Sequence, residues 1–303
     1  MQKYRANGKL LLTGEYLVLD GAIALSLPTQ AGQTLELENQ DNAKLDWRSL
    51  DYKDKTWFEF TYTEVEKEII NNPIAERLRQ VLLQAKEQNP AFLQKLNCRV
   101  TSKLEFPENW GLGSSSTLIH LIAQWANCNP FELLFKTFGG SGYDIASAGS
   151  NKPVLYRLIE KKLPDFQTVD FIPPFNQQLY FIYLGKKQNS RTGIKHFREK
   201  GKYGEKDITE ISNITQSIIQ VKELNEFEKL IAQHEKIISR ILSMTPVQKI
   251  YFSDYWGQIK SLGAWGGDFV LATSGKSYSK TKKYFNEKGF DVFLKYEDMI
   301  IKD

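Results

Sequence analysis

Residues 107–116 read Pro-Glu-Asn-Trp-Gly-Leu-Gly-Ser-Ser-Ser, and they separate an apolar, strand-like run at 98–104 from an amphipathic, helix-like run at 117–126. Glycines let the backbone bend so that several N–H groups point into one concavity, and the following helix adds the positive end of its dipole. Such a turn suits phosphate oxygens. It is neither the Walker loop, which needs Gly-Lys-Ser/Thr, nor the dinucleotide loop, which needs a third glycine. Taken alone, it is equally typical of a flexible loop whose serine caps a helix.

A second glycine-rich stretch, residues 139–147, reads Gly-Gly-Ser-Gly-Tyr-Asp-Ile-Ala-Ser and places Asp144 shortly after a glycine turn. A carboxylate held there beside a phosphate site can orient an attacking hydroxyl or accept its proton. The simpler interpretation is that Asp144 caps a short helix.

Two further segments combine glycine with charge. Residues 260–269 read Lys-Ser-Leu-Gly-Ala-Trp-Gly-Gly-Asp-Phe, and glycines just before a strand permit close backbone approach, although a helix C-cap followed by a turn gives the same pattern. Residues 8–16 read Gly-Lys-Leu-Leu-Leu-Thr-Gly-Glu-Tyr and carry Lys9 into an apolar strand. Because burying an unpaired ammonium is costly, we expect an anion near Lys9 unless it faces solvent from an edge strand.

The hydrophobic periodicity predicts an α+β chain. We expect strands at 9–12, 16–19, 23–27, 33–37, 57–62, 98–104, 154–157, 179–183, 269–273 and 290–294. We expect helices at 73–88, 117–126, 225–242, 245–261 and 276–288. Residues 161–174 contain three prolines and no clear periodicity, which favours a domain change there.

Composition excludes several classes of protein. The 303 residues suggest two domains, and a net charge of +4 is too small for a nucleic-acid binder but suits a cleft for anionic ligands. We expect no signal peptide, no membrane span and a cytoplasmic location, with Cys98 and Cys128 reduced. His120 and His234 fall on or beside apolar helical faces and His196 lies in a basic stretch, so no hydrolase triad or metal cluster is indicated.

In their order and spacing, the four segments resemble the motifs of the GHMP kinase superfamily, which includes galactokinase, homoserine kinase, mevalonate kinase and phosphomevalonate kinase. The resemblance spans nearly the whole chain. It implies an α+β GHMP kinase fold, with a ribosomal protein S5 domain 2-like N-terminal domain at 1–165 and a ferredoxin-like C-terminal domain at 166–303.

The resemblance also implies roles for individual residues. Lys9 matches the lysine that neutralises the transferring phosphoryl group, and Asp144 matches the aspartate that acts as base or orients the acceptor. The ATP-binding positions are Gly111, Leu112, Gly113, Ser114, Ser115 and Ser116, and Ser115 is the expected ligand of the Mg²⁺ that accompanies ATP. The positions expected to contact or shape the acceptor site are Glu15, Tyr16, Ser141, Gly142, Lys186, Ser190, Lys260, Gly263 and Asp268.

Within the superfamily, the stretch 140–147 is similar to that of phosphomevalonate kinases, and Tyr16 stands where mevalonate kinases and galactokinases usually carry His. We therefore expect transfer of the γ-phosphoryl of ATP to phosphomevalonate, in isoprenoid biosynthesis, by a monomer or homodimer. A phosphorylated acceptor needs basic groups, for which the candidates are Lys186, Lys187, Arg191, Lys195 and Lys260. The alternatives are mevalonate kinase or another small-molecule kinase of the superfamily, and a non-catalytic ligand-binding homologue.

Two positions depart from the family pattern. Leu133, with Glu132 beside it, stands where mevalonate kinases carry a magnesium-binding glutamate, so the metal shell is incomplete and Asp144 or water would have to complete it. Trp265 replaces a glycine of the third motif, where an indole would narrow the cleft or stack on a ligand.

Overall fold

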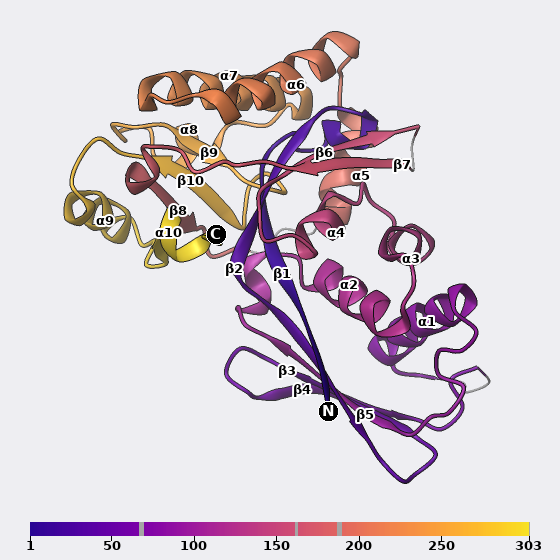
Figure 1. Cartoon of the computed structure of the whole chain (residues 1–303). Coiled ribbons are helices and arrows are strands. Elements are labelled where there is room, and N and C mark those ends of the chain that lie inside the picture. Colours follow the sequence, from indigo (N-terminus) through magenta and orange to yellow (C-terminus); the bar gives the residue numbers. More distant parts are fainter. Residues whose placement is uncertain (67–69, 161–162, 187–189, 303) are drawn as a thin grey trace. The chain divides into compact units, whose positions relative to one another are not determined.

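The computed structural model describes residues 1–66, 70–160, 163–186 and 190–302, except for the side chain of Ser190, and the chain forms two compact units (Figure 1). The first unit comprises Met1–Gly8, Ala31–Glu108 and Leu112–Gly149, and the second comprises Lys9–Gln30, Asn109–Gly111 and Ser150–Asp303. Two long strands, β1 (Gln2–Thr13) and β2 (Ala24–Asn39), contribute residues to both units. The domain boundary expected at residues 165 and 166 lies inside β7 (Leu163–Thr168), whereas the first unit ends at Gly149.

The first unit is a sheet with helices along one face (Figure 1). Its strands follow the order β4-β3-β5-β2, with β1 paired to β2, and β3 runs parallel to β5 and antiparallel to β4. The further elements are β3 (Leu45–Leu50), β4 (Thr56–Tyr62), β5 (Cys98–Leu104), α1 (Pro73–Gln88), α2 (Ser114–Ala126), α3 (Pro130–Thr137) and α4 (Tyr143–Ala148). Apolar side chains of the sheet and of α1, α2 and α3 form one core, which includes Leu35, Trp47, Val100, Leu82, Ile122 and Leu133.

Local sequence explains where these helices begin. Asn72 precedes Pro73, and its side chain accepts the backbone N–H groups of Ile74 and Ala75. The pair Asn129 and Pro130 caps α3 in the same way. An asparagine cap satisfies N–H groups that have no partner within the helix, and proline at the first position loses no hydrogen bond, so both helices start where the sequence dictates.

The second unit contains an antiparallel sheet of order β11-β8-β10-β9. The same unit holds β6, which pairs with the first residues of β2 and with β7. Its elements are η1 (Leu17–Asp20), β6 (Val154–Ile159), η3 (Asn176–Gln178), β8 (Leu179–Tyr183), α5 (Ser190–Lys200), α6 (Glu205–Gln220), α7 (Leu224–Leu242), α8 (Val247–Tyr251), β9 (Ile259–Ser261), β10 (Phe269–Thr273), α9 (Tyr278–Glu287), β11 (Phe293–Lys295) and α10 (Tyr296–Met299). The short helix η2 (Glu108–Trp110) has residues in both units. This sheet contributes to a second hydrophobic core, which includes Ile182, Phe252, Val270 and Phe285.

Three expectations about secondary structure were wrong. Residues 16–19 form a tight turn and a 3₁₀ helix rather than a strand. The segments 23–27 and 33–37 belong to a single strand, β2, which continues through Pro28. The helix expected at 245–261 ends at Tyr251, and its last three residues form β9 instead.

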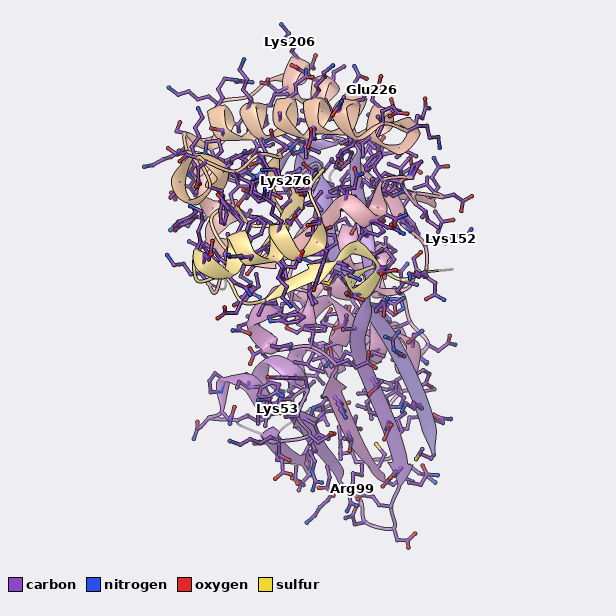
Figure 2. All side chains as sticks on the ribbon, turned by 90° about the vertical axis from the view of Figure 1, so that its left-hand side faces the viewer. Lys53, Arg99, Lys152, Lys206, Glu226 and Lys276 are labelled. Atoms are coloured by element: carbon purple, nitrogen blue, oxygen red, sulfur yellow. The ribbon has the colours of Figure 1, made fainter. Side chains whose placement is uncertain are left out.

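Charged side chains of both signs cover the exterior, among them Lys53, Arg99, Lys152, Lys206, Glu226 and Lys276 (Figure 2). Some of these charges are engaged locally: Lys152 pairs with Asp170, and the ammonium of Lys276 lies 3.8 Å from the ring centroid of Trp256. In the described part of the chain, none of the helices has both the length and the hydrophobicity needed to cross a membrane.

Candidate active site

Three of the sequence motifs meet at Gly111, within the second unit. The Lys9 ammonium donates to the Gly111 carbonyl oxygen at 3.3 Å. Gly111 has φ of 69°, and a methyl group on its α-carbon would lie 2.5 Å from Cγ of Asp268. Only glycine therefore fits this position, because the backbone is left-handed and the Asp268 carboxylate packs directly against it.

The residues before Gly111 are held against the second sheet. Trp110 packs edge-to-face on Phe269 of β10, with ring centroids 5.4 Å apart, and the Tyr183 hydroxyl donates to the Asn109 carbonyl at 2.9 Å. Aromatic pairs of this geometry favour one arrangement of the backbone. The first half of the glycine-serine loop thus has a fixed conformation relative to β8 and β10.

The second half of the loop starts α2 in the first unit. Gly113 is the N-cap, with φ of 93°, and Leu112 beside it is fully buried. The Ser116 hydroxyl donates to the Gly113 carbonyl at 2.9 Å, so this serine braces the turn, whereas Ser115 is exposed. The helix presents its first N–H groups and the positive end of its dipole at these serines, which suits an anion.

Asp144 lies in the first turn of α4, in the first unit. Gly142 precedes this helix with φ of 92°, and Asp144 Oδ1 accepts the N–H of its neighbour Ile145 at 3.1 Å. Asp144 is half-buried, and Ser141 beside it is buried. Among the predicted site residues with described side chains, residues 112–116, 141, 142 and 144 belong to the first unit. The others belong to the second unit.

Four ionisable side chains form a buried cluster in the second unit: Glu15, His234, Glu235 and Lys260. The Lys260 side chain is 0% exposed; its ammonium pairs with Glu15, donates to the Ser261 carbonyl at 2.9 Å and lies 3.7 Å from Glu235 Oε1. The Glu15 side chain is 1% exposed. Glu15 and Lys260 were both expected to contact or shape the acceptor site, but in this structure each is shielded from solvent and each binds the other.

Burial and neighbouring charges decide the protonation states in this cluster. Burial acts to raise the pKa of Glu15, but the opposing charge of Lys260 outweighs it, and the pKa is held below its usual range. Burial raises the pKa of Glu235 to about 8, against the opposing charge of Lys260. Burial and the charge of Lys260 lower the pKa of His234. Beside Lys260, the cluster thus holds one carboxylate, one protonated carboxyl and one neutral imidazole at neutral pH.

The neutral imidazole explains its contacts. His234 Nε2 accepts the Gly14 N–H at 3.1 Å, and Glu15 Oε2 lies 3.1 Å from the same nitrogen. A ring nitrogen that accepts a hydrogen bond from the Gly14 N–H carries no proton and cannot also donate to Glu15, and the lowered pKa favours this acceptor role. The sequence indicated that His234 lies at an apolar helix face, and it is fully buried there; nothing in the pattern indicated its contact with Gly14.

The third glycine segment contacts two other predicted positions. The Asp268 N–H donates to the Lys186 carbonyl at 2.7 Å, and the Trp265 N–H donates to the Tyr16 hydroxyl at 3.2 Å. The Trp265 side chain is not placed to stack on a ligand, since the residue is only 4% exposed. Gly263 has φ of 64°, which a side chain would strain. Lys186 is exposed, while Lys187 and the side chain of Ser190 lie outside the described residues.

An apolar residue of α3 stands where the sequence comparison placed a magnesium ligand. Leu133 is fully buried in the core of the first unit, so no ligand oxygen occupies the position of the family's glutamate, and Glu132 is exposed on α3. Among the described residues, no group of three or more His, Cys, Asp or Glu side chains is arranged to hold a metal ion.

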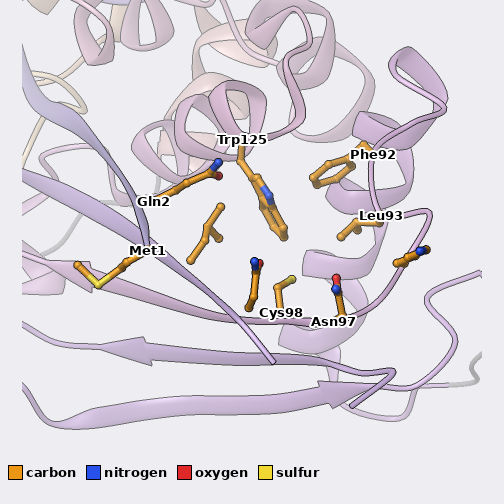
Figure 3. Close-up of a pocket in the computed structure, with 10 residues that line it drawn as sticks. Met1, Gln2, Phe92, Leu93, Asn97, Cys98 and Trp125 are labelled. Carbon is orange, nitrogen blue, oxygen red and sulfur yellow. The ribbon is translucent and has the colours of Figure 1, made fainter. Parts of the chain in front are cut away.

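A hollow of about 320 Å³ in the first unit is lined by none of the predicted site residues (Figure 3). Trp125, Phe92 and Leu93 form its apolar wall, and Gln2 and Asn97 lie at its edge. Cys98 also lines it, but burial raises the pKa of this thiol to about 11, which keeps it protonated and unreactive. The lining includes Lys95 and several amide side chains but no carboxylate, histidine or hydroxyl group.

Comparison with known proteins places the fold. No protein-family model matches the sequence, and no curated protein matches it either. Among solved structures, mevalonate kinase from Methanococcus jannaschii superposes with a TM-score of 0.74 at 14% identity, over 100% of this chain and 98% of that one. Phosphomevalonate kinase from Streptococcus pneumoniae, in complex with phosphomevalonate and AMPPNP, gives a TM-score of 0.74 at 17% identity, over 97% and 100%. Galactokinase from Lactococcus lactis gives 0.66 at 14% identity, over 99% and 95%.

These structures share one architecture despite their low identity to this chain, and each similarity extends over nearly the full length of both partners. The prediction of fold is confirmed: the chain has the α+β fold of the GHMP kinase superfamily.

Proposed function

We propose that this chain is an ATP-dependent small-molecule kinase that transfers the γ-phosphoryl group of ATP to phosphomevalonate. The observation that supports the proposal most strongly is the meeting of Lys9, Asp268 and Gly111. Lys9 and Gly111 are 102 residues apart in the chain, yet the ammonium of one binds the carbonyl of the other, and Asp268 packs against the same glycine. A lysine ammonium held at a glycine turn is an arrangement suited to phosphate groups.

In this proposal the loop 111–116 binds the phosphates of ATP. Positive φ angles at Gly111 and Gly113 turn the chain, and the N–H groups at the start of α2 are available to phosphate oxygens. Ser114 and Ser115 would add hydroxyl donors, while the Ser116 hydroxyl is already used to brace the turn. Magnesium bound with ATP would offset phosphate charge, with Ser115 as its protein ligand.

The two catalytic residues of the proposal are Lys9 and Asp144. The Lys9 ammonium would offset negative charge on the transferring group, and its bond to Gly111 would direct it toward the phosphate loop. Asp144 would orient the acceptor hydroxyl or take its proton. Since both roles act on charge that develops during transfer, each is expected to affect turnover more than ATP affinity.

The acceptor assignment depends on exposed positive charge. Lys260 is buried and paired with Glu15, so it would shape the site rather than bind an anion directly. Lys186, Arg191 and Lys195 are exposed at the end of β8 and on α5, and they are the described basic groups that we propose hold the phosphate of the acceptor. The alternative is mevalonate, because the mevalonate and phosphomevalonate kinases superpose equally well on this chain.

The direct test is ADP release with Mg²⁺-ATP and a panel of mevalonate, phosphomevalonate, homoserine and galactose, with Asp144→Asn as the inactive control. We expect turnover with phosphomevalonate, and loss of charge in Lys186→Ala/Arg191→Ala should raise the KM for that acceptor. Turnover with mevalonate alone would replace the acceptor, and turnover with homoserine or galactose would place the chain elsewhere in the superfamily. ATP binding in calorimetry without ADP release from any acceptor would instead favour a non-catalytic ligand-binding homologue.

A further inference from the structure

The backbone at Tyr16 adopts a strained conformation with positive φ. Tyr16 has φ of 63° and ψ of −49°, and the Leu17 N–H donates to the Glu15 carbonyl at 2.7 Å. These features define a γ-turn with positive φ, which is rare and strained, and a bulky residue at positive φ is unfavourable in its own right. Strain of this kind persists only where the surroundings hold it, and it often marks a functional segment.

On one side, the buried cluster holds the turn. The Gly14 N–H donates to His234 of α7, and the Glu15 carboxylate binds Lys260 of β9. Gly14 itself fits closely, since a methyl group there would lie 2.6 Å from the Ala24 side chain. The residues before Tyr16 are therefore fixed to α7, β9 and β2.

On the other side, the Tyr16 ring packs on α5. Its centroid lies 5.4 Å from that of Phe197, in a stacked arrangement, and Phe197 in turn stacks on Tyr203 at 4.8 Å. One helical turn before Phe197, Gly193 faces the Tyr16 hydroxyl: a methyl group at 193 would lie 2.8 Å from that oxygen. Gly193 and Phe197 share one face of the helix, and Tyr16 lies across both.

The same hydroxyl contacts the third glycine segment, because it accepts the Trp265 N–H at 3.2 Å. A second tether lies beside it, where Arg198 and Tyr203 both bind Asp20 at 2.8 and 2.9 Å. The Asp268 N–H binds the Lys186 carbonyl, four residues before α5 begins. Tyr16 is thus a spacer between α5 and the loop 263–268. Of the basic residues proposed to hold the acceptor, Arg191 and Lys195 belong to α5, and Lys186 is tied to the loop through Asp268.

We infer that Tyr16 is a positioning residue for an anionic acceptor: its hydroxyl, wedged between Gly193 and the Trp265 N–H, sets the spacing of α5 from the loop 263–268. The inference rests on the proposed function for the identity of the ligand, but the packing of Tyr16 against Gly193 can be tested without it. A hydroxyl that occupies the space of a side chain at 193 requires glycine there, whereas a phenylalanine at 16 does not.

The test is a double-mutant cycle of Tyr16→Phe and Gly193→Ala, with melting temperature and steady-state kinetics as readouts. Gly193→Ala should lower the melting temperature when Tyr16 is present, because the new methyl strikes its hydroxyl. With Phe at 16 the same change should leave the melting temperature unchanged or raise it, since alanine is the better helix former. Gly204→Ala is the matched control: nothing lies within 4 Å of a methyl at 204, so its effect should be equal in both backgrounds.

The kinetic readout separates positioning from stability. Tyr16→Phe keeps the ring stack but loses the hydrogen bond to Trp265, and we expect about a tenfold rise in the KM for the acceptor, with kcat and the KM for ATP within about twofold of wild type. Additive melting temperatures across the cycle would overturn the inference, as would an unchanged acceptor KM in Tyr16→Phe. Loss of all ADP release in the wild-type panel would reject the proposed function and with it the acceptor role, while the melting-temperature cycle would still report the contact itself.

Discussion

Lys260 and Glu15 form an ion pair in which both side chains are shielded from water, at 0% and 1% exposure. They lie 245 residues apart in the sequence, and the Lys260 ammonium also lies 3.7 Å from Glu235 Oε1. The attraction between two such charges offsets the cost of removing them from water only while both are present. Removing either residue alone should therefore destabilise the second unit.

Lys260→Met should therefore destabilise the protein by about 3–5 kcal/mol, because it leaves the Glu15 carboxylate buried without its cation. The measurement is the free energy of unfolding from urea titration of the full chain in the absence of ligand. Lys195→Met is the control, since Lys195 is 76% exposed and its ion pair with Glu199 is long, so it should change stability by no more than about 0.5 kcal/mol. The double variant Lys260→Met/Glu15→Gln should recover part of the loss; equal losses for Lys260→Met and Lys195→Met would contradict the buried pair.

Glu235 should make stability depend on pH. Its ordinary pKa is 4.5 and burial raises the folded value to about 8, so between these limits the folded chain holds a proton that the unfolded chain has released. Stability from this group is therefore full at low pH and is lost as the pH rises toward 8, by at most about 1.4 kcal/mol per pH unit. His234 has the opposite sign, because its folded pKa is lowered from 6.5, and it acts below that pH. Lys260 and Glu15 face both groups.

Between pH 6.5 and 8, the effect of Glu235 is therefore separate from that of His234. In this range, unfolding titrations should show falling stability in the wild type and a flatter profile in Glu235→Gln. A wild-type profile that stays flat across this window, and so matches that of Glu235→Gln, would show that Glu235 is already ionised in the folded protein.

The parts of the fold that follow from local sequence were predicted well. The helix at 73–88 and the strand at 98–104 have the bounds that the apolar spacing gave, because Asn72 and Pro73 set one end of the helix and alternation sets the strand. The strand expected at 16–19 failed for a tertiary reason: Glu15, Tyr16 and Asp20 are held by α7, β9 and α5, and these contacts force a turn. The helix expected to reach 261 failed because residues 259–261 pair with β10 instead.

In the candidate site, too, some features follow from local sequence and others depend on tertiary contacts. The glycines at 111, 113 and 142 could be identified from sequence, because positive φ is a property that residue type signals. The pairing of Lys260 with Glu15 could not, since it depends on the register in which Lys260 lies opposite Leu271 and on the fold of the distant Gly14–Tyr16 turn. A charged residue at the start of a glycine motif carries no sign of whether it will meet a ligand or another side chain.

Asp144→Asn should lower kcat by about 10²–10⁴-fold, because the amide keeps the shape of the side chain but neither takes a proton nor orients a hydroxyl as a carboxylate does. Its melting temperature should stay close to that of the wild type, since the side-chain oxygen of asparagine can still accept the Ile145 N–H. Steady-state ADP release and calorimetric unfolding check the two parts. Asp170→Asn, at an exposed carboxylate that is 83% accessible, is the control and should leave kcat unchanged. Near-normal turnover in Asp144→Asn would remove this residue from the proposed mechanism and leave it as a helix residue.

Lys9→Met tests the other proposed catalytic group on the same principle of charge, with a matched control on the same strand. Methionine fills the space of the lysine stem but cannot donate to the Gly111 carbonyl or offset charge on a moving phosphoryl group. If the charge acts mainly on the transition state, kcat should fall by about 10²–10³-fold while the Kd for ATP changes by less than about tenfold, since only interactions that strengthen during transfer raise the rate. Lys3→Met removes a positive charge from β1 as well, but Lys3 is 56% exposed and paired with Glu36, so both constants should stay near wild type. An equal loss of ATP affinity and turnover in Lys9→Met would mean that Lys9 holds the loop in shape rather than stabilising the transferring group, and an unchanged rate would mean that the bond to Gly111 has no part in catalysis.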